Sequence, residues 1–199
     1  MRSLDQEWDV EIRPQGSPIS PVRTSKPDRG FGFAPSSDPQ DFLSKQTLRS
    51  LASDPRTRLL FSPQRSRELI FPFCVYEAKS AMGGSIGLAE NQCAVGAATA
   101  VALFLELARL SGAKAATCPP VFMLASMGFA WSIHACIGKT IDGIDNYEIY
   151  PLTTVLDLRN SIQLFLFQII LSRIRDYALS TTKSWVKEHL ARVLLQIKK

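Results

Sequence analysis

The sequence predicts an α/β fold, with a mixed central sheet flanked by helices. Three kinds of stretch support this prediction. The run 69–78 is almost entirely apolar and rich in β-branched and aromatic residues, which is typical of a buried strand. The stretch 88–112 is rich in alanine, contains no proline and ends on glycine, which is typical of a buried helix. Two further strand-like runs follow at 121–126 and 129–137.

Shorter signals predict the elements around this core. Asp41 is well placed to cap a short helix over 41–52, and the run 58–61 (RLLF) has the composition of a short strand. Later in the chain, the Asp-Gly pair at 142–143 predicts a turn that leads into a short strand at 147–150.

Two helices close the predicted domain. Thr154 and Asp157 have the spacing of a capping box, which predicts a helix that runs to about residue 178. The segment 184–197 places its apolar residues on one helical face. The predicted order is therefore helix, strand, strand, helix, strands, helix, helix.

The first 40 residues differ in composition from the rest of the chain. They contain six prolines and three glycines, and they lack the periodicity that buries one face of an element. We expect a disordered tail over 1–40 and a single folded domain over 41–199.

Charge and cysteine content narrow the class of protein only slightly. The formal charge of +5 over 199 residues is compatible with a nucleic-acid partner, but many proteins without such a partner are equally basic. The cysteines form no CxxC pair and no cluster with histidine, so a zinc site is not indicated. We expect buried free thiols in a reducing compartment. The cysteines are Cys74, Cys93, Cys118 and Cys136.

The sequence does not indicate secretion or a membrane span. Acidic residues at positions 5, 7, 9 and 11 fall where a signal peptide needs an apolar core. The apolar run 119–137 approaches the length of a span, but two prolines open it and Gly128 interrupts it, so we predict a buried pair of strands. We expect an intracellular protein, nuclear or cytoplasmic, with no membrane partner, and the oligomeric state stays open.

The strand predicted at 69–78 runs into an acid and an amine. Side chains alternate across a strand, so Glu77 and Lys79 are expected on the same face. A carboxylate from Glu77 and the carbonyl of Ala78 could hold Mg²⁺, and Lys79 could position a water or offset the charge of a phosphate. The alternative is an ion pair at a strand end with no chemical role, because such tripeptides are common.

The text around this pair resembles the PD-(D/E)XK nuclease superfamily, in particular uncharacterised fungal members. The matching segments are FPFCVYEAKS, ENQCAVGAATA and PPVFMLASMGFAWSI, within 59–178. The resemblance implies a restriction-endonuclease-like fold in which Glu77 is a metal ligand and Lys79 the catalytic lysine. It also implies that Gln92 lies in the first turn of the following helix and faces the site or the nucleic-acid backbone. The alternative for Gln92 is a capping or solvated role.

The superfamily also has a further acid near the end of the preceding strand. Here the run 58–61 is followed by Ser-Pro-Gln, so no acid stands at that position. The nearest candidate is Asp54, which could equally be a turn or helix-end residue. The predicted metal ligands are therefore Glu77, Ala78 and Asp54, with Mg²⁺ as the cofactor.

The prediction is a metal-dependent phosphodiesterase acting on DNA or RNA, with an incomplete metal site. One alternative is a catalytically inactive nuclease-like domain that binds nucleic acid or protein. Another is a decayed or truncated gene product without a folded function.

Overall fold

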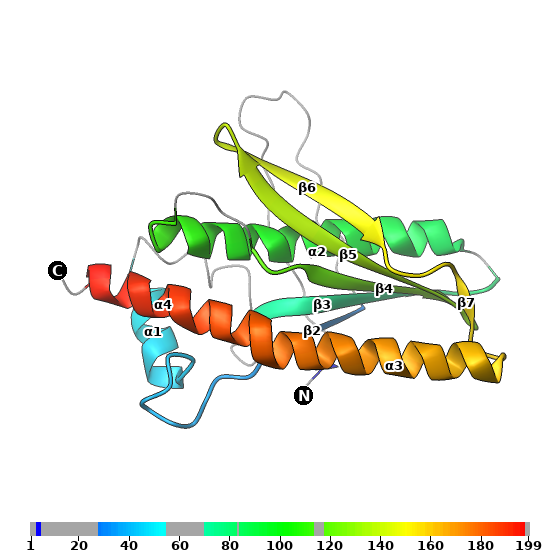
Figure 1. Ribbon diagram of the computed structural model, residues 1–199, viewed down its shortest axis with the longest axis horizontal. Helices are drawn as coiled ribbons and strands as arrows, with labels where there is room; N and C mark the ends of the chain where they lie inside the picture. The colour runs from blue at the N-terminus through cyan, green and yellow to red at the C-terminus, as the bar shows by residue number, and fades with distance from the viewer. Residues whose placement is uncertain (1–2, 5–27, 55–69, 83, 114–117, 198–199) are drawn as a thin grey trace.

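A computed structural model describes residues 3–4, 28–54, 70–82, 84–113 and 118–197 of the 199-residue chain. Within these ranges the protein is an α/β structure in which helices cover both faces of one mixed sheet (Figure 1). The predicted fold class is therefore confirmed. The strand predicted at 58–61 lies outside the described residues.

The sheet has the strand order β1–β2–β3–β4–β5–β6, and β7 pairs with a part of β5 that β6 leaves open. All neighbouring strands are antiparallel except β3 and β4, which are parallel and are joined through helix α2 (Ile86–Leu110). The strands are β1 (Ser3–Leu4), β2 (Arg29–Phe33), β3 (Ile70–Lys79), β4 (Val121–Met127), β5 (Ala130–Ile141), β6 (Ile144–Pro151) and β7 (Leu156–Asp157).

Strand β2 corrects the predicted boundary of the folded domain. The sequence analysis assigned 1–40 to a disordered tail, but residues 28–40 are part of the described structure, and β2 pairs along β3. In the segment RGFGF, phenylalanines alternate with glycines, and Phe33 is buried with its ring 5.4 Å from that of Phe73. Alternation over five residues is enough for a strand when a buried neighbour supplies the hydrogen bonds and the apolar contact. Residues 5–27 lie outside the described part.

Helix α2 is the core helix of the domain. The Ser85 side chain accepts a hydrogen bond from Leu88 N at its start, and Gly112, with φ of 77°, follows its end as predicted. By length and composition α2 could cross a membrane, but most of it is buried against the sheet, which accounts for its apolar character.

Helix α2 lies very close to β5 at Gly138. A Cβ atom added to Gly138 would overlap the side chain of Val101 and lie 3.0 Å from Leu105 Cδ1. The absence of a side chain at this position therefore sets the distance between the helix and the sheet.

The other face of the sheet is covered by α3 (Ser161–Tyr177). The π-helical turn η2 (Ala178–Thr182) leads from α3 into α4 (Lys183–Ile197), which extends past the sheet and packs against α2, where the Trp185 ring lies 5.8 Å from that of Phe104. The predicted capping box at Thr154 and Asp157 is wrong. Asn160 caps α3, accepting hydrogen bonds from the backbone of residues 162 and 163. Leu156 is instead buried in β7, opposite Trp131 of β5.

The π-helical turn lets α3 and α4 bury their apolar residues on the same side of the continuous helical run. Phe167 and Ile174 are buried in α3, whereas Val186, Leu190 and Val193 are buried in α4. At about 100° per residue the two sets are out of phase by one residue. A π turn holds one residue more than an α turn, so η2 brings both apolar faces toward the interior.

Helix α1 (Lys45–Ser53) begins later than predicted. Its N-cap is Ser44, whose hydroxyl accepts a hydrogen bond from Thr47 N. The Asp41 carboxylate instead accepts from Leu43 N and forms an ion pair of 3.0 Å with Lys187. Asp41 therefore fastens the segment before α1 to α4.

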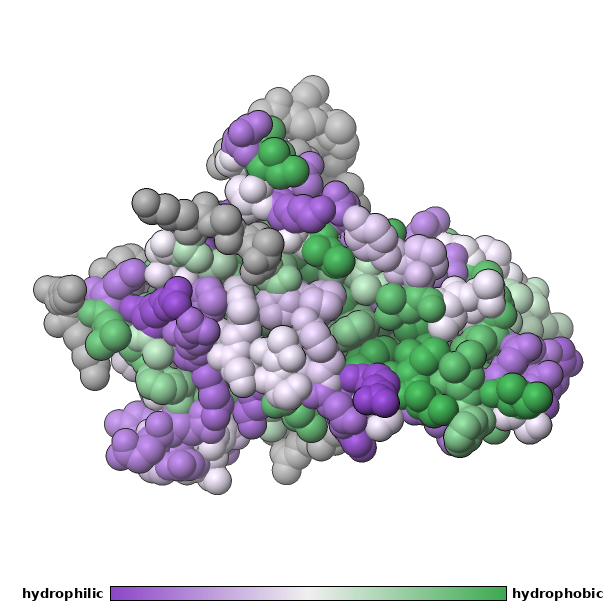
Figure 2. Space-filling model, in the orientation of Figure 1, coloured by the Kyte–Doolittle hydropathy of each residue, from purple (hydrophilic) through white to green (hydrophobic). Residues whose placement is uncertain are grey.

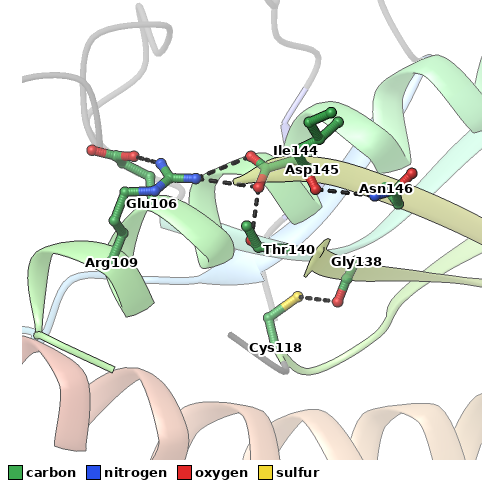
Figure 3. A network of polar contacts seen from close by, with 8 residues as sticks. All are labelled: Glu106, Arg109, Cys118, Gly138, Thr140, Ile144, Asp145 and Asn146. Carbon is green, nitrogen blue, oxygen red and sulfur yellow. Dashed lines mark hydrogen bonds and ion pairs between the residues drawn. The ribbon is translucent and has the colours of Figure 1, made fainter. Parts of the chain in front are cut away.

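The hairpin of β5 and β6 is tied to the end of α2 by charged side chains (Figure 3). Arg109 pairs with Glu106 on its own helix and with Asp145 of β6 at 3.1 Å, and Thr140 donates to the same Asp145 carboxylate. The turn at 142–143 has positive φ at both residues, as the Asp-Gly pair predicts.

All four cysteines are buried and free, as predicted. Burial raises the thiol pKa of Cys118 to about 11, and of Cys93 and Cys136 to about 12, so the reactive thiolate is scarce at neutral pH. We expect a thiol reagent such as DTNB to modify the native protein much more slowly than the urea-unfolded chain. A cysteine that reacts in seconds in the folded protein would contradict this burial.

Candidate active site at the end of strand β3

Glu77 and Lys79 lie at the carboxyl end of β3 and point to the same face, as strand alternation predicts. The Lys79 ammonium donates to Glu77 Oε1 at 2.6 Å. Glu77 is 3% exposed, whereas the Lys79 side chain is 22% exposed. A nearly buried carboxylate is thus balanced by an amine that reaches the surface.

Asp28 brings a second carboxylate to the same place. It immediately precedes β2, and the register of β2 against β3 places it opposite Glu77. Asp28 N donates to Glu77 Oε2 at 3.1 Å, and Ala78 N donates to Asp28 Oδ2 at 2.7 Å. The two hydrogen bonds run in opposite directions between the two chain segments. They hold both acids together at the carboxyl end of β3, which is the edge of the sheet meant below.

The three charged groups leave this edge negatively charged. Asp28 and Glu77 contribute two negative charges, and Lys79 contributes one positive charge. Taken alone, these three groups repel a phosphate and attract a cation. Within the described residues, no group of three or more His, Cys, Asp and Glu side chains is gathered in a way that could hold a metal by itself.

The loop after β3 packs on the stem of Lys79. Gly84 N donates to Ser80 O at 3.1 Å, and a Cβ atom at Gly84 would lie only 2.7 Å from Lys79 Cβ. Because that contact is to the first carbon of the side chain, Lys79 could not avoid it by moving its flexible end. Gly84 therefore helps to set the direction in which the Lys79 amine leaves the strand.

Gln92 is in the second turn of α2 rather than the first, since the helix begins at Ile86. The next residue, Cys93, faces the sheet and its thiol donates to Leu124 O at 3.1 Å. Glu90 lies on the side of the helix nearer β5, because its Oε1 atom is 3.8 Å from Nε2 of His134 in that strand. Gln92 lies on the opposite flank of the helix from Glu90, so its flank is turned toward β3 and β2.

The structure does not bring Asp54 to this site. Asp54 follows α1 and its backbone N–H bonds Leu51 O, so it is the helix-end residue that the sequence left as the alternative. Figure 1 shows α1 at the opposite end of the sheet from the loop that joins β3 to α2. The second carboxylate beside Glu77 is therefore that of Asp28, which the sequence analysis placed in the tail.

A family model described as a domain of unknown function, DUF7924, matches residues 1–123, which is more than half of the chain. The chain belongs to the DUF7924 family. No curated protein and no solved structure matches it. The DUF7924 match includes β2, β3 and α2, and therefore Asp28, Glu77, Lys79 and Gln92.

Proposed function

We propose that this DUF7924 protein is a metal-dependent phosphodiesterase of the PD-(D/E)XK nuclease-like type, acting on DNA or RNA. The proposal rests on one observation, the pair of hydrogen bonds that places the Asp28 carboxylate beside Glu77 and Ala78. Through these bonds Asp28 lies next to Glu77 as a second acid, which β3 itself does not contain. Pro27-Asp28 and Glu77-Ala78-Lys79 also match the two parts of the motif for which the superfamily is named.

The oxygen atoms at this edge suit Mg²⁺. Asp28 and Glu77 would give one carboxylate each, and the Ala78 carbonyl a third oxygen. Magnesium in nucleotide enzymes commonly takes one or two carboxylates and fills the remaining positions with water and phosphate oxygens. A carboxylate has about four acceptor sites, so the oxygens that accept from Lys79 and from Asp28 N keep capacity for a cation. When bound, the ion would acidify a coordinated water and offset phosphate charge.

The chain's own groups would position the substrate. Lys79 can donate from its partly exposed ammonium to a water or to a phosphate oxygen, while its bond to Glu77 holds the amine at the strand end. Gln92, on the flank of α2 turned toward β3, could bind the nucleic-acid backbone. Because the site is net negative without a cation, we expect binding of nucleic acid at this edge to require the metal.

The test is Mg²⁺- or Mn²⁺-dependent cleavage of supercoiled plasmid, single-stranded DNA and RNA by the purified full chain. Glu77→Gln is expected to lower the cleavage rate about 100-fold or more, because the carboxylate charge is lost while the shape is kept. Glu148→Gln is the matched control, since Glu148 also pairs with a lysine, Lys139, at 2.8 Å, but on the exposed β5–β6 hairpin. Chelation by EDTA is expected to abolish cleavage.

A second candidate function is favoured by the burial of Glu77. Its two oxygens accept from Lys79 and from Asp28 N, which also suits a purely structural ion pair in a nuclease-like domain that binds nucleic acid without cutting it. A folded protein that shifts the mobility of DNA or RNA but cleaves none with either metal would support this candidate and overturn the phosphodiesterase.

A further inference from the structure

The solvent side of α3 carries an unusual row of exposed apolar side chains. Ile162 is 77% and Phe165 65% exposed, and Leu166 and Ile169 are also exposed. They recur at i, i+3, i+4 and i+7, which places them on one stripe of the helix, opposite the face that buries Phe167. Figure 2 shows the hydrophobic surface gathered at this end of the molecule.

The apolar surface extends beyond the helix. Phe129 before β5 and Val155 before β7 are exposed as well. Phe129 lies against the start of α3, because Leu158 N bonds Phe129 O and the Arg159 guanidinium lies 5.6 Å from the Phe129 ring. Together with the stripe these side chains expose roughly 500 Å² if a large apolar residue presents about 150 Å² when free. A typical monomer exposes no patch larger than about 300–600 Å².

We propose that this face pairs with the same face of a second copy of the chain, α3 lying antiparallel against α3. A two-fold axis brings one patch against itself, so the patch must be complementary to itself. Residues 161–172 contain no charged side chain, so a self-pairing of this stripe brings no like charges together. A patch of roughly 500 Å² of apolar side chain, together with the polar area around it, approaches the ~800 Å² per partner of a standard stable interface.

A membrane surface suits the same stripe less well. Helices that lie in the lipid interface usually combine an apolar face with an excess of lysine and arginine. Here the charged residues that flank the stripe, within 157–177, are three arginines and two aspartates, an excess of only one positive charge. Arg159 pairs with Asp157 at 2.6 Å, and Arg175 pairs with Asp176 at 3.0 Å.

The first test is the mass of the full chain in solution, measured by light scattering and sedimentation over a range of concentrations. The native protein is expected at twice the 22.1 kDa chain mass. Phe165→Glu would set a carboxylate against its symmetry mate and is expected to weaken association about 100-fold or more, which leaves a monomer. Ile144→Glu is the matched control, because Ile144 is 67% exposed at the β5–β6 hairpin, and it is expected to stay dimeric.

A cysteine cross-link gives a second measurement. The midpoint of the stripe 162–169 lies between Phe165 and Leu166, so in the antiparallel pair the two-fold axis would pass close to Phe165. A short bis-maleimide is therefore expected to join Phe165→Cys to its symmetry mate. Leu195→Cys on α4, which is also exposed, is not expected to be cross-linked. The native thiols are buried and do not compete. A native chain that stays monomeric at all concentrations overturns the proposal, and so does a Phe165→Glu protein that stays dimeric. Vesicle binding by a monomer would overturn it in favour of a lipid surface.

Discussion

Replacement of Asp28 by asparagine is expected to lower metal-dependent cleavage about 100-fold or more while leaving the fold intact. The asparagine side-chain oxygen can still accept the hydrogen bond from Ala78 N, which the Asp28 carboxylate accepts at 2.7 Å, and the backbone N–H of residue 28 still reaches Glu77. What the substitution removes is one negative charge from an edge that has two carboxylates and one amine. Glu77 is then the one carboxylate left at this site to bind a cation, against the positive charge of Lys79.

The matched control for this variant is Asp38→Asn. The Asp38 carboxylate also accepts a backbone hydrogen bond, from Gln40 N at 2.9 Å, but it lies in the loop before α1, at the other end of the sheet. Both variants keep the fold, which circular dichroism would verify, and only Asp28→Asn is expected to lose the metal-dependent rate and Mg²⁺ binding by calorimetry. Full activity of Asp28→Asn would remove Asp28 from the site, even if Glu77 proved essential.

The second large effect concerns the packing of α2 against the sheet. Gly138→Ala is expected to lower the free energy of unfolding by about 2 kcal/mol, and Tm by roughly 4–8 °C. The new methyl group would overlap the Val101 side chain, whose branched Cβ leaves few rotamers into which it could move. The helix would have to shift away from β5, and contacts along the whole core helix would loosen with it.

Gly87→Ala is the control for Gly138→Ala in the same urea and thermal unfolding measurements. Gly87 lies in the first turn of α2, and a Cβ atom there would meet only Ser85 Oγ, at 3.9 Å. Alanine also restricts the unfolded chain more than glycine, so this variant is expected to be unchanged or stabilised by up to about 1 kcal/mol. Equal stability of the two alanine variants would show that α2 lies further from Gly138 than the structure places it.

The parts of the fold that were predicted from sequence are those whose signal is local. The run that forms β3, the alanine-rich core helix and the hairpin of β4 and β5 each contain their own periodicity and their own end signals. Strand β2 was missed because its five residues alternate phenylalanine with glycine inside a proline-rich stretch. Its stability comes from pairing with a strand some forty residues away, which composition does not reveal.

Helix starts were less predictable for a related reason. Several side chains near each start could act as the cap, and tertiary contacts decide between them. Asp41 is used for an ion pair with Lys187, so Ser44 caps α1. Leu156 of β7 is buried beside Trp131, so α3 begins later than predicted and its cap is Asn160 rather than Thr154.

The candidate site divides in the same way. Glu77 and Lys79 lie two residues apart, so strand alternation alone places both on one face. Asp28 lies 49 residues before Glu77 and reaches it only through the pairing of β2 with β3. The available signal was an acid directly before a short alternating segment, but without the sheet order it does not say which strand the acid will face.

The π-helical turn at 178–182 bears on how the chain tolerates changes of length. Deleting one residue there would give an uninterrupted α-helix from α3 to α4, with Phe167 and Val186 both still directed inward. A deletion within α3 would instead rotate everything beyond it by about 100° and turn Val186 and Leu190 toward water. Homologous chains that are one residue shorter between Ser161 and Val186 are therefore expected to lack that residue within this turn.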